Sequence, residues 1–316
     1  MARIRGFYAL AILFKDYPGE IYVARKDSPM ILAVADGETY LASDVPAILK
    51  YARDVYYVGN REMGRLRAGE ITFYNQDGDE IEKECKQIEW DAEAAEKAGY
   101  EHFMMKEIHE QPRSIRDTMN SVVKDGKIDL SSMELSEDEI CKLRQIYIVA
   151  CGSAWHVGMV AQYVIEDLTR IPVRVELAFE FRYRRPILDP DGLVIIISQS
   201  GETADSLAAL REAKAQGVKT LGIVNVVGSS IAREADNVFY TLAGPEVAVT
   251  TTKACSTQLI AAYILAIEFA KVRGQIDGER YSSLLGEMAT LPDKIESILQ
   301  DTERIQWFAA KQANTR

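Results

Sequence analysis

The sequence predicts an α/β protein in which a parallel β-sheet is covered by helices and is preceded by an antiparallel, β-rich segment. Two observations support this. From Gln145 onwards, continuous apolar runs such as Leu193–Ile197 alternate with helical segments, which is typical of parallel strands buried on both faces. Before Trp90, short β-prone runs follow one another with turn signals between them, which is typical of antiparallel strands.

The β-rich segment contains several runs in which apolar and polar residues alternate, as in antiparallel strands with one solvated face. The expected strands lie in RGFYALAILF, EIYVARK, PMILAVA, TYLAS, DVYYVG, EITFYN and EIEKECKQIEW. Turn signals such as Pro18-Gly19, Asp36-Gly37 and Asp77-Gly78 separate them. The apolar run Phe7–Phe14 is interpreted as a strand rather than a signal peptide, because it is short and ends in Lys15-Asp16.

The character of the chain changes after Trp90. Residues 91–139 are rich in Glu, Lys, Ala and Met with helical periodicity, and they contain one proline, Pro112. We interpret them as helices that connect two domains. Beyond them, the expected strands are IYIVA, VRVELA, GLVIIIS, TLGIVN and NVFYTL, and the expected helices are AWHVGMVAQYVIEDLTR, TADSLAALREAKAQG, SSIAREA and TTKACSTQLIAAYILAIEFAKVRG. Two further helical segments follow Gly274.

Composition and charge exclude several function classes. The net charge of -11 and the pI near 5.0 argue against nucleic acid and anionic membranes as partners, and the Lys and Arg residues form no basic stripe. The longest apolar run, Leu259–Ile267, is far shorter than the ~20 residues that cross a bilayer. The four cysteines form no C-x-x-C pattern and only three histidines are present, so we expect no metal site, reduced thiols and a soluble cytoplasmic protein.

Three loops share a chemistry that favours anion binding. Cys151-Gly152-Ser153, Ser198–Thr203 and Thr250-Thr251-Thr252 each place small hydroxyl residues at or near a helix start, the first two directly after a strand. Ligands of open α/β sheets bind at the carboxyl ends of the strands, and helix starts offer unpaired N–H groups that suit a phosphate. The alternative is that these residues are ordinary N-caps. No G-x-G-x-x-G and no G-x-x-x-x-G-K-[ST] pattern indicates a nucleotide cofactor.

Six stretches of the chain resemble one enzyme family. ACGSAWHVGMV, EFRYRRP, SQSGETADSLAALREAK and VTTTKACSTQL are similar to the first sugar-isomerase (SIS) domain of glutamine–fructose-6-phosphate aminotransferases, the glucosamine-6-phosphate synthases. EHFMMKEIHEQPRSIRDTM resembles the connector of that family, and RGFYALAILF through TYLASD resembles the second half of its glutaminase domain. The resemblance implies a flavodoxin-like SIS domain after part of an Ntn-hydrolase-like domain.

The resemblance also implies a substrate and its contacts. The family moves the amide nitrogen of glutamine to fructose 6-phosphate and forms glucosamine 6-phosphate for amino sugar and UDP-GlcNAc biosynthesis. By resemblance, Ser198, Gln199, Ser200 and Thr203 hold the sugar phosphate. Ser153 matches a hydroxyl position of the first loop, and Val249 and Thr251 match positions that line the sugar. Ala154 stands where some members carry Ser, which removes one contact.

The family's glutaminase nucleophile and its acid and base residues match no position here, so we expect no catalytic residue in this chain. We expect four parts: residues 1–92 as the second half of a glutaminase-type domain, 93–140 as a helical connector, 141–275 as the SIS domain, and 276–316 as helices that lead to a second SIS domain. The chain is thus expected to be a fragment that binds substrate without turnover. We also expect residues 1–90 to lack a partner sheet on one face.

Other candidate side chains favour structural roles. We expect His156 and Cys151 to serve packing, Glu202 to cap or pack, and Glu180, Arg182 and Arg184 to form an ion-pair patch. Lys253 is compatible with phosphate or with a carboxylate partner and is left out of the site. By analogy, SIS domains pair into homodimers. The competing hypotheses are a non-catalytic phosphosugar-binding SIS protein and a self-sufficient SIS isomerase or deglycase.

Overall fold

The computed structural model describes residues 4–88 and 97–313. The chain divides into two compact units, Met1–Ala98 and Gly99–Arg316, which are described separately. The expected boundary between residues 92 and 93 lies outside the described residues. The division into four parts therefore remains a prediction.

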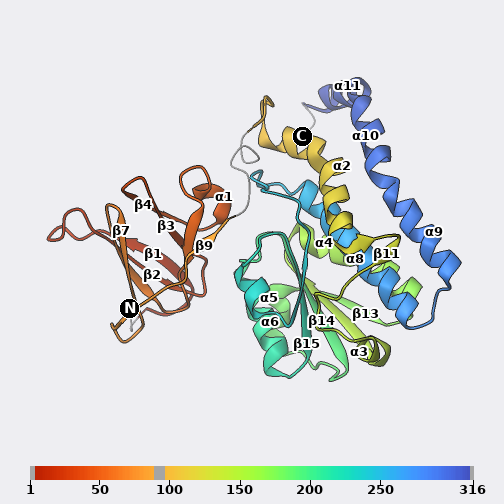
Figure 1. The fold of residues 1–316 in the computed structure, drawn as a ribbon, viewed down its shortest axis with the longest axis horizontal. Helices are drawn as coiled ribbons and strands as arrows, with labels where there is room; N and C mark the ends of the chain where they lie inside the picture. The colour runs from red at the N-terminus through yellow and green to blue at the C-terminus, as the bar shows by residue number, and fades with distance from the viewer. Residues whose placement is uncertain (1–3, 89–96, 314–316) are drawn as a thin grey trace. The chain divides into compact units, whose positions relative to one another are not determined.

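The first unit consists of two antiparallel sheets and one short helix, α1 (Val45–Ile48). One sheet has the order β1-β2-β6-β7-β8, with bounds Tyr8–Ile12, Ile21–Lys26, Met63–Arg67, Glu70–Tyr74 and Glu80–Ile81. The other has the order β4-β3-β5-β9, with bounds Glu38–Ala42, Ile31–Ala35, Asp54–Tyr57 and Lys86–Gln87. Figure 1 shows these strands in red and orange. The expectation of an antiparallel, β-rich segment is confirmed.

The two sheets of the first unit share a core. Val23 of β2 and Leu66 of β6 pack in one cluster with Leu32 of β3, so apolar faces of both sheets meet. The expectation that residues 1–90 lack a partner sheet is wrong in this respect, because the second sheet is built from the same segment. Strand β6 was not predicted, because Arg65 and Arg67 hide its alternation of buried and exposed residues.

The second unit is built on a parallel sheet of five strands in the order β13-β12-β14-β15-β16. Their bounds are Gln145–Ala150 for β12, Val173–Leu177 for β13, Gly192–Ser198 for β14, Lys219–Val224 for β15 and Asn237–Tyr240 for β16. All four pairings are parallel, with Ile148 opposite Ile195 and Ile195 opposite Leu221. This order is that of doubly wound flavodoxin-like sheets, and it confirms the predicted architecture.

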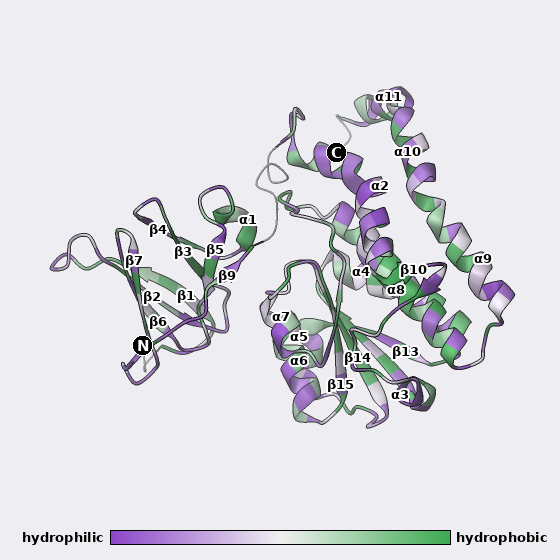
Figure 2. Ribbon diagram, in the orientation of Figure 1, coloured by the Kyte–Doolittle hydropathy of each residue, from purple (hydrophilic) through white to green (hydrophobic). Residues whose placement is uncertain are grey.

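Helices cover both faces of this sheet. Alternate residues of β12 point to opposite sides, so Ile146 and Ile148 join one core cluster whereas Tyr147 and Val149 join the other. Helices α4 (Ser153–Thr169) and α8 (Lys253–Val272) cover the first face. Helices α5 (Ala178–Arg184), α6 (Ala204–Ala215) and α7 (Ser230–Glu234) cover the other (Figure 1). The central strand β14 is buried throughout, and Figure 2 shows the sheet as largely hydrophobic.

Four more of the described helices pack on the α8 side, namely α2 (Phe103–Val122), α3 (Glu137–Lys142), α9 (Gly278–Ala289) and α10 (Leu291–Gln300). Helix α11 (Thr302–Gln312) follows and has no buried residue, so the described residues after Gly274 form three helices rather than the expected two. Helix α2 lies against α8, and its Arg116 pairs with Asp293 of α10 at 2.6 Å. A hairpin of β10 (Val123–Lys124) and β11 (Lys127–Ile128) follows α2. This hairpin and α5 were not predicted, because both are too short to show a period.

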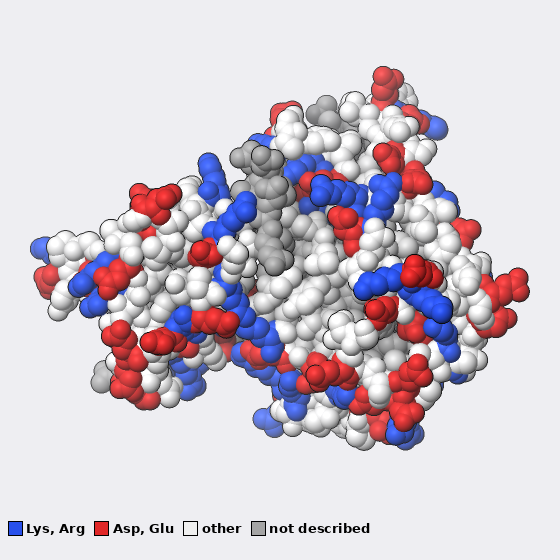
Figure 3. Space-filling model, in the orientation of Figure 1, with Lys and Arg blue, Asp and Glu red and all other residues white. Residues whose placement is uncertain are grey.

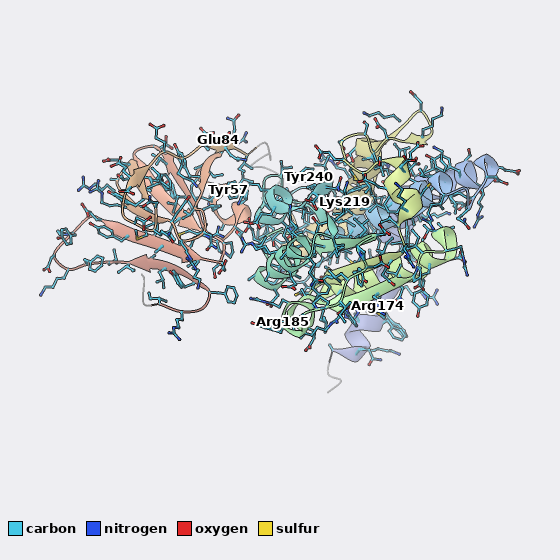
Figure 4. The ribbon with its side chains drawn as sticks, turned by 90° about the horizontal axis from the view of Figure 1, so that it is seen from below. Tyr57, Glu84, Arg174, Arg185, Lys219 and Tyr240 are labelled. Atoms are coloured by element: carbon cyan, nitrogen blue, oxygen red, sulfur yellow. The ribbon has the colours of Figure 1, made fainter. Side chains whose placement is uncertain are left out.

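Helix α8 is the one helix in the described residues that is long and apolar enough to cross a membrane, and 61% of its most apolar window is buried inside the unit. Its apolar side chains pack on the sheet and on α4. On the surface, Figure 3 shows Lys and Arg side chains interspersed with Asp and Glu over the face drawn. Figure 4 adds the side chains in a perpendicular view and labels Arg174 on β13 at the edge of the sheet.

We predict that Ile195→Ala destabilises the second unit by about 2–5 kcal/mol, because Ile195 is 1% exposed in the central strand and the change leaves a cavity. The matched control is Ile187→Ala, since the Ile187 side chain is 89% exposed and its loss costs less than about 0.5 kcal/mol. Urea unfolding followed by circular dichroism measures both. Equal losses for the two variants would contradict the placement of β14 in the core.

Candidate functional site

The candidate site lies at the carboxyl ends of β12 and β14. These strands are neighbours, but the chain leaves β12 toward β13 on one side and returns to β14 on the other. This is the topological switch point at which open α/β sheets bind ligands. The loop after β12 contains Gly152 and leads into α4, and the loop after β14 contains Ser198–Thr203 and leads into α6.

A pocket of about 170 Å³ opens between these loops and the start of α8. It is lined by Cys151, Ser153, Ala154, Ile197, Ser198, Gln199, Ser200, Thr203, Thr251 and Gln258. Six of the seven predicted site residues are thus brought together, and the seventh, Val249, is fully exposed outside the lining. Among the described residues, no Asp, Glu, His, Lys or Arg lines the pocket. The arrangement can bind a ligand, but its lining offers no titratable acid or base apart from the Cys151 thiol.

Hydroxyl groups organise the loop after β14. Ser198 Oγ accepts a hydrogen bond from the backbone N–H of Gly201 at 3.1 Å and lies 3.0 Å from Thr203 Oγ1. Ser200 Oγ accepts from the N–H of Glu202 at 3.2 Å. On the opposite wall, Ser153 Oγ donates to Thr251 Oγ1 at 3.1 Å. The lining therefore presents preorganised hydroxyls from three separate segments of the chain.

Two glycines allow the backbone to take this course. Gly152 has φ 58° and ψ -133°, which side chains disfavour, although a Cβ there would contact nothing. Gly201 has φ +64°, and a Cβ there would come within 2.0 Å of Ser229 Oγ. Gly201 is thus required both by its conformation and by the close approach of the start of α7.

The structure excludes side-chain capping at two of the three helix starts. Neither α4 nor α6 has a side-chain hydrogen bond at its N-cap, which is Gly152 in α4 and Thr203 in α6. The hydroxyls that sequence reasoning allowed as caps therefore do not cap these helices. The N-terminal N–H groups of both helices are left without a side-chain cap beside the pocket, where an anion is stabilised by the helix dipole.

The third helix start is capped by a carboxylate instead. Glu246 Oε2 accepts from the N–H groups of Ala254 at 2.8 Å and Thr252 at 3.3 Å. Burial raises the pKa of Glu246 above its ordinary value, although these two hydrogen bonds oppose the shift. The carboxylate of Glu246 thus occupies the N–H groups at this helix start. Thr251 contributes to the pocket through its hydroxyl instead.

Helix α2 holds the segment that carries Thr251. Glu107, which is 1% exposed, accepts from the N–H groups of Val247 at 2.6 Å and Ala248 at 3.0 Å. Lys253 is buried and donates to Glu110 at 2.6 Å, so it has a carboxylate partner and does not line the pocket. Sequence reasoning left both partners of Lys253 open, and the structure selects the carboxylate.

The other candidate side chains have structural positions. His156 is exposed on α4 beside Trp155, and Glu202 accepts from the N–H of Ser230 at 2.8 Å at the start of α7. Arg182 pairs with Asp205 at 2.8 Å, and Arg184 pairs with Glu176. Cys151 is half-buried in the pocket wall, and Gln258 was missed altogether. In the sequence, the only signal for Gln258 is a single amide residue in the first half of a long, largely apolar helix.

Comparisons with known proteins identify relatives of the chain and a family match within its second unit. The family model described as SIS domain matches residues 139–268. A glutamine–fructose-6-phosphate aminotransferase (isomerizing) of Caldanaerobacter subterraneus subsp. tengcongensis is 48% identical over 315 residues, which is 99% of this chain and 52% of that protein. The protein of the same name from Clostridium acetobutylicum is 50% identical over 98% of this chain and 51% of its own length. The chain thus spans about half the length of these relatives.

A solved structure supports the fold of the second unit. The C-terminal domain of glucosamine-fructose-6-phosphate aminotransferase from Francisella tularensis superposes with a TM-score of 0.67 and is 36% identical. The match covers 69% of this chain and 61% of that one.

We predict that Gly201→Ala destabilises the second unit by about 1–3 kcal/mol more than Gly217→Ala, because only the first change forces a Cβ against a buried hydroxyl. Both glycines have positive φ, +64° and +75°, so the backbone strain is matched, and a Cβ at Gly217 meets no atom within 4 Å. Thermal unfolding of both variants measures the difference. Equal losses would mean that conformation alone selects Gly201.

A second prediction concerns the pocket thiol. Burial raises the pKa of Cys151, and because the thiolate is the reactive form, iodoacetamide at pH 8 should alkylate Cys151 more slowly than the exposed Cys141. The Cys151 rate should continue to rise at pH values above the ordinary pKa of a thiol. Peptide mass spectrometry after timed quenching follows both sites in one sample. Equal rates at pH 8 would contradict the burial of this thiol in the pocket wall.

Proposed function

On the premise that the chain carries a SIS domain and is homologous to about half of the glutamine–fructose-6-phosphate aminotransferases, we propose that its pocket binds the phosphate group of fructose 6-phosphate. The observation that carries this proposal is a hydroxyl-lined pocket beside two helix starts that lack side-chain caps. Ser198, Gln199, Ser200 and Thr203 bind the phosphate, and Ser153 and Thr251 complete the opposite wall.

The chemistry of the pocket suits a reversible phosphate ligand. A phosphate monoester carries close to two negative charges at neutral pH and accepts hydrogen bonds through three oxygens. Helix N–H groups and hydroxyls offer the matching donors, whereas no fixed cation lines the pocket. The ligand is thus held by hydrogen bonds and partial charges, which permits release after each cycle.

The pocket contributes binding to a larger reaction. We assign to the chain the fructose 6-phosphate site for transfer of the glutamine amide nitrogen, with glucosamine 6-phosphate and glutamate as products. This reaction serves amino sugar and UDP-GlcNAc biosynthesis in the cytoplasm. Val249 belongs to the sugar-facing residues in this assignment, and SIS domains of two copies pair into a homodimer.

One observation favours a second candidate function, a non-catalytic phosphosugar-binding protein. No carboxylate, imidazole or amine lines the pocket, and sugar isomerisation needs such an acid or base. The two candidates share the same binding step and differ in turnover. Formation of glucosamine 6-phosphate from fructose 6-phosphate and glutamine, followed by mass spectrometry, separates them, and we expect the chain alone to form none.

We predict that the chain binds fructose 6-phosphate in calorimetric titration, with fructose and inorganic phosphate as reference ligands. Ser198→Ala/Ser200→Ala should weaken this binding at least tenfold, because it removes two hydroxyls of the phosphate loop. Ser282→Ala/Ser283→Ala is the matched control, since both serines are exposed on α9 outside the pocket. Absence of binding by the folded chain would refute the proposal, as would equal affinity of the two double variants.

A further inference from the structure

Gln258 is an unexplained polar side chain in the pocket wall. It lies in α8, is 2% exposed, and lines the same pocket as the phosphate loop. Its Oε1 atom is fully buried and has no hydrogen-bond partner among the described residues. Buried amides are normally paired, so an unpaired amide beside a ligand pocket requires an explanation.

The unpaired oxygen has an energetic cost to the fold. A buried acceptor without a donor destabilises a protein, because the loss of its hydration is not compensated. The residues one turn away on the same face of α8, Ala254, Ala261 and Ala262, are buried and apolar, so an apolar residue would suit this face of the helix. Among the described residues, the Oε1 atom of Gln258 therefore makes no hydrogen bond that would stabilise the folded state.

Another glutamine of the same layer provides a contrast. Gln162 of α4 donates through Nε2 to the carbonyl oxygen of Val173 at 2.9 Å, and so joins its helix to the edge strand β13. This side chain has a structural partner within the fold. Gln258 differs because it has none there and because it faces the pocket.

We propose that Gln258 recognises the sugar, by accepting a hydrogen bond from a sugar hydroxyl of the bound phosphosugar at Oε1. This inference rests on the proposed function and adds a specificity-determining residue to that site. The unpaired atom is an acceptor, so its partner must be a donor. A phosphate dianion offers only acceptors, whereas each sugar hydroxyl can donate.

The position of Gln258 on α8 agrees with this role. The phosphate loop follows β14, whereas Gln258 and Thr251 enter the pocket from α8 and the segment before it. The terminal amide turns about a soft torsion, so Oε1 can face a ligand without rebuilding the helix. A phosphosugar thus satisfies the hydroxyl loop at one end and the amide at the other.

The test is Gln258→Met, which keeps the length of the side chain and removes its hydrogen bonding. We predict that it weakens fructose 6-phosphate binding about tenfold in calorimetric titration. The affinity for inorganic phosphate, measured by its competition with the sugar phosphate, should stay unchanged. Without ligand, the thermal unfolding temperature should remain equal or rise, because an unsatisfied buried group has been removed.

Gln162→Met is the matched control, with the opposite expected pattern of lower stability and unchanged affinity. An unchanged affinity of Gln258→Met for fructose 6-phosphate would overturn the inference, and so would an equal loss of phosphate affinity or a lower unfolding temperature. If the unsubstituted chain does not bind fructose 6-phosphate, the proposed function is refuted, and the inference about Gln258 is refuted with it. If the unsubstituted chain binds and Gln258→Met binds equally well, only the inference is refuted.

Discussion

The site depends on the buried polar face of helix α2. Along this face, Glu107 accepts from the backbone of residues 247 and 248, Thr118 donates to the carbonyl of Thr241, and Ser114 donates to the carbonyl of Ala243 at 3.3 Å. Gln111 accepts from Ser256 at 2.6 Å within α8. The segment that joins β16 to α8 has no strand or helix of its own, so its backbone groups need partners from other segments. Helix α2 supplies several of them, and the buried side chain of Asn225 supplies others, since it accepts from the N–H of Ala243 at 2.7 Å and donates to the carbonyl of Gly244 at 2.7 Å.

This arrangement keeps charges near the pocket but out of it. Lys253 is neutralised by Glu110, and Glu246 occupies the start of α8. What remains in the pocket are hydroxyls, amides and the starts of α4 and α6, whose partial charges suit an anion without fixing a counter-charge beside it.

Much of the site could be predicted because strand ends and hydroxyl loops are local signals. The run Leu193–Ile197 followed by Ser198–Thr203 predicts a buried strand and a loop at its carboxyl end, and the parallel sheet brings that loop beside Ser153. Gln258 could not be predicted, because its significance is an unpaired oxygen that appears only when α8 packs beside the loops. Likewise, nothing in the local sequence shows that Glu246 caps α8 or that Lys253 pairs with a helix 143 positions earlier.

The amino-acid sequence by itself determined the class of the protein. Apolar runs buried on both faces require a covered parallel sheet. Only the tertiary structure decided the strand order β13-β12-β14-β15-β16, which helix starts have a side-chain cap, and that two sheets of the first unit cover each other. Periodicity records which side chains are buried, whereas hydrogen-bond partners are chosen by the packing of segments distant along the chain.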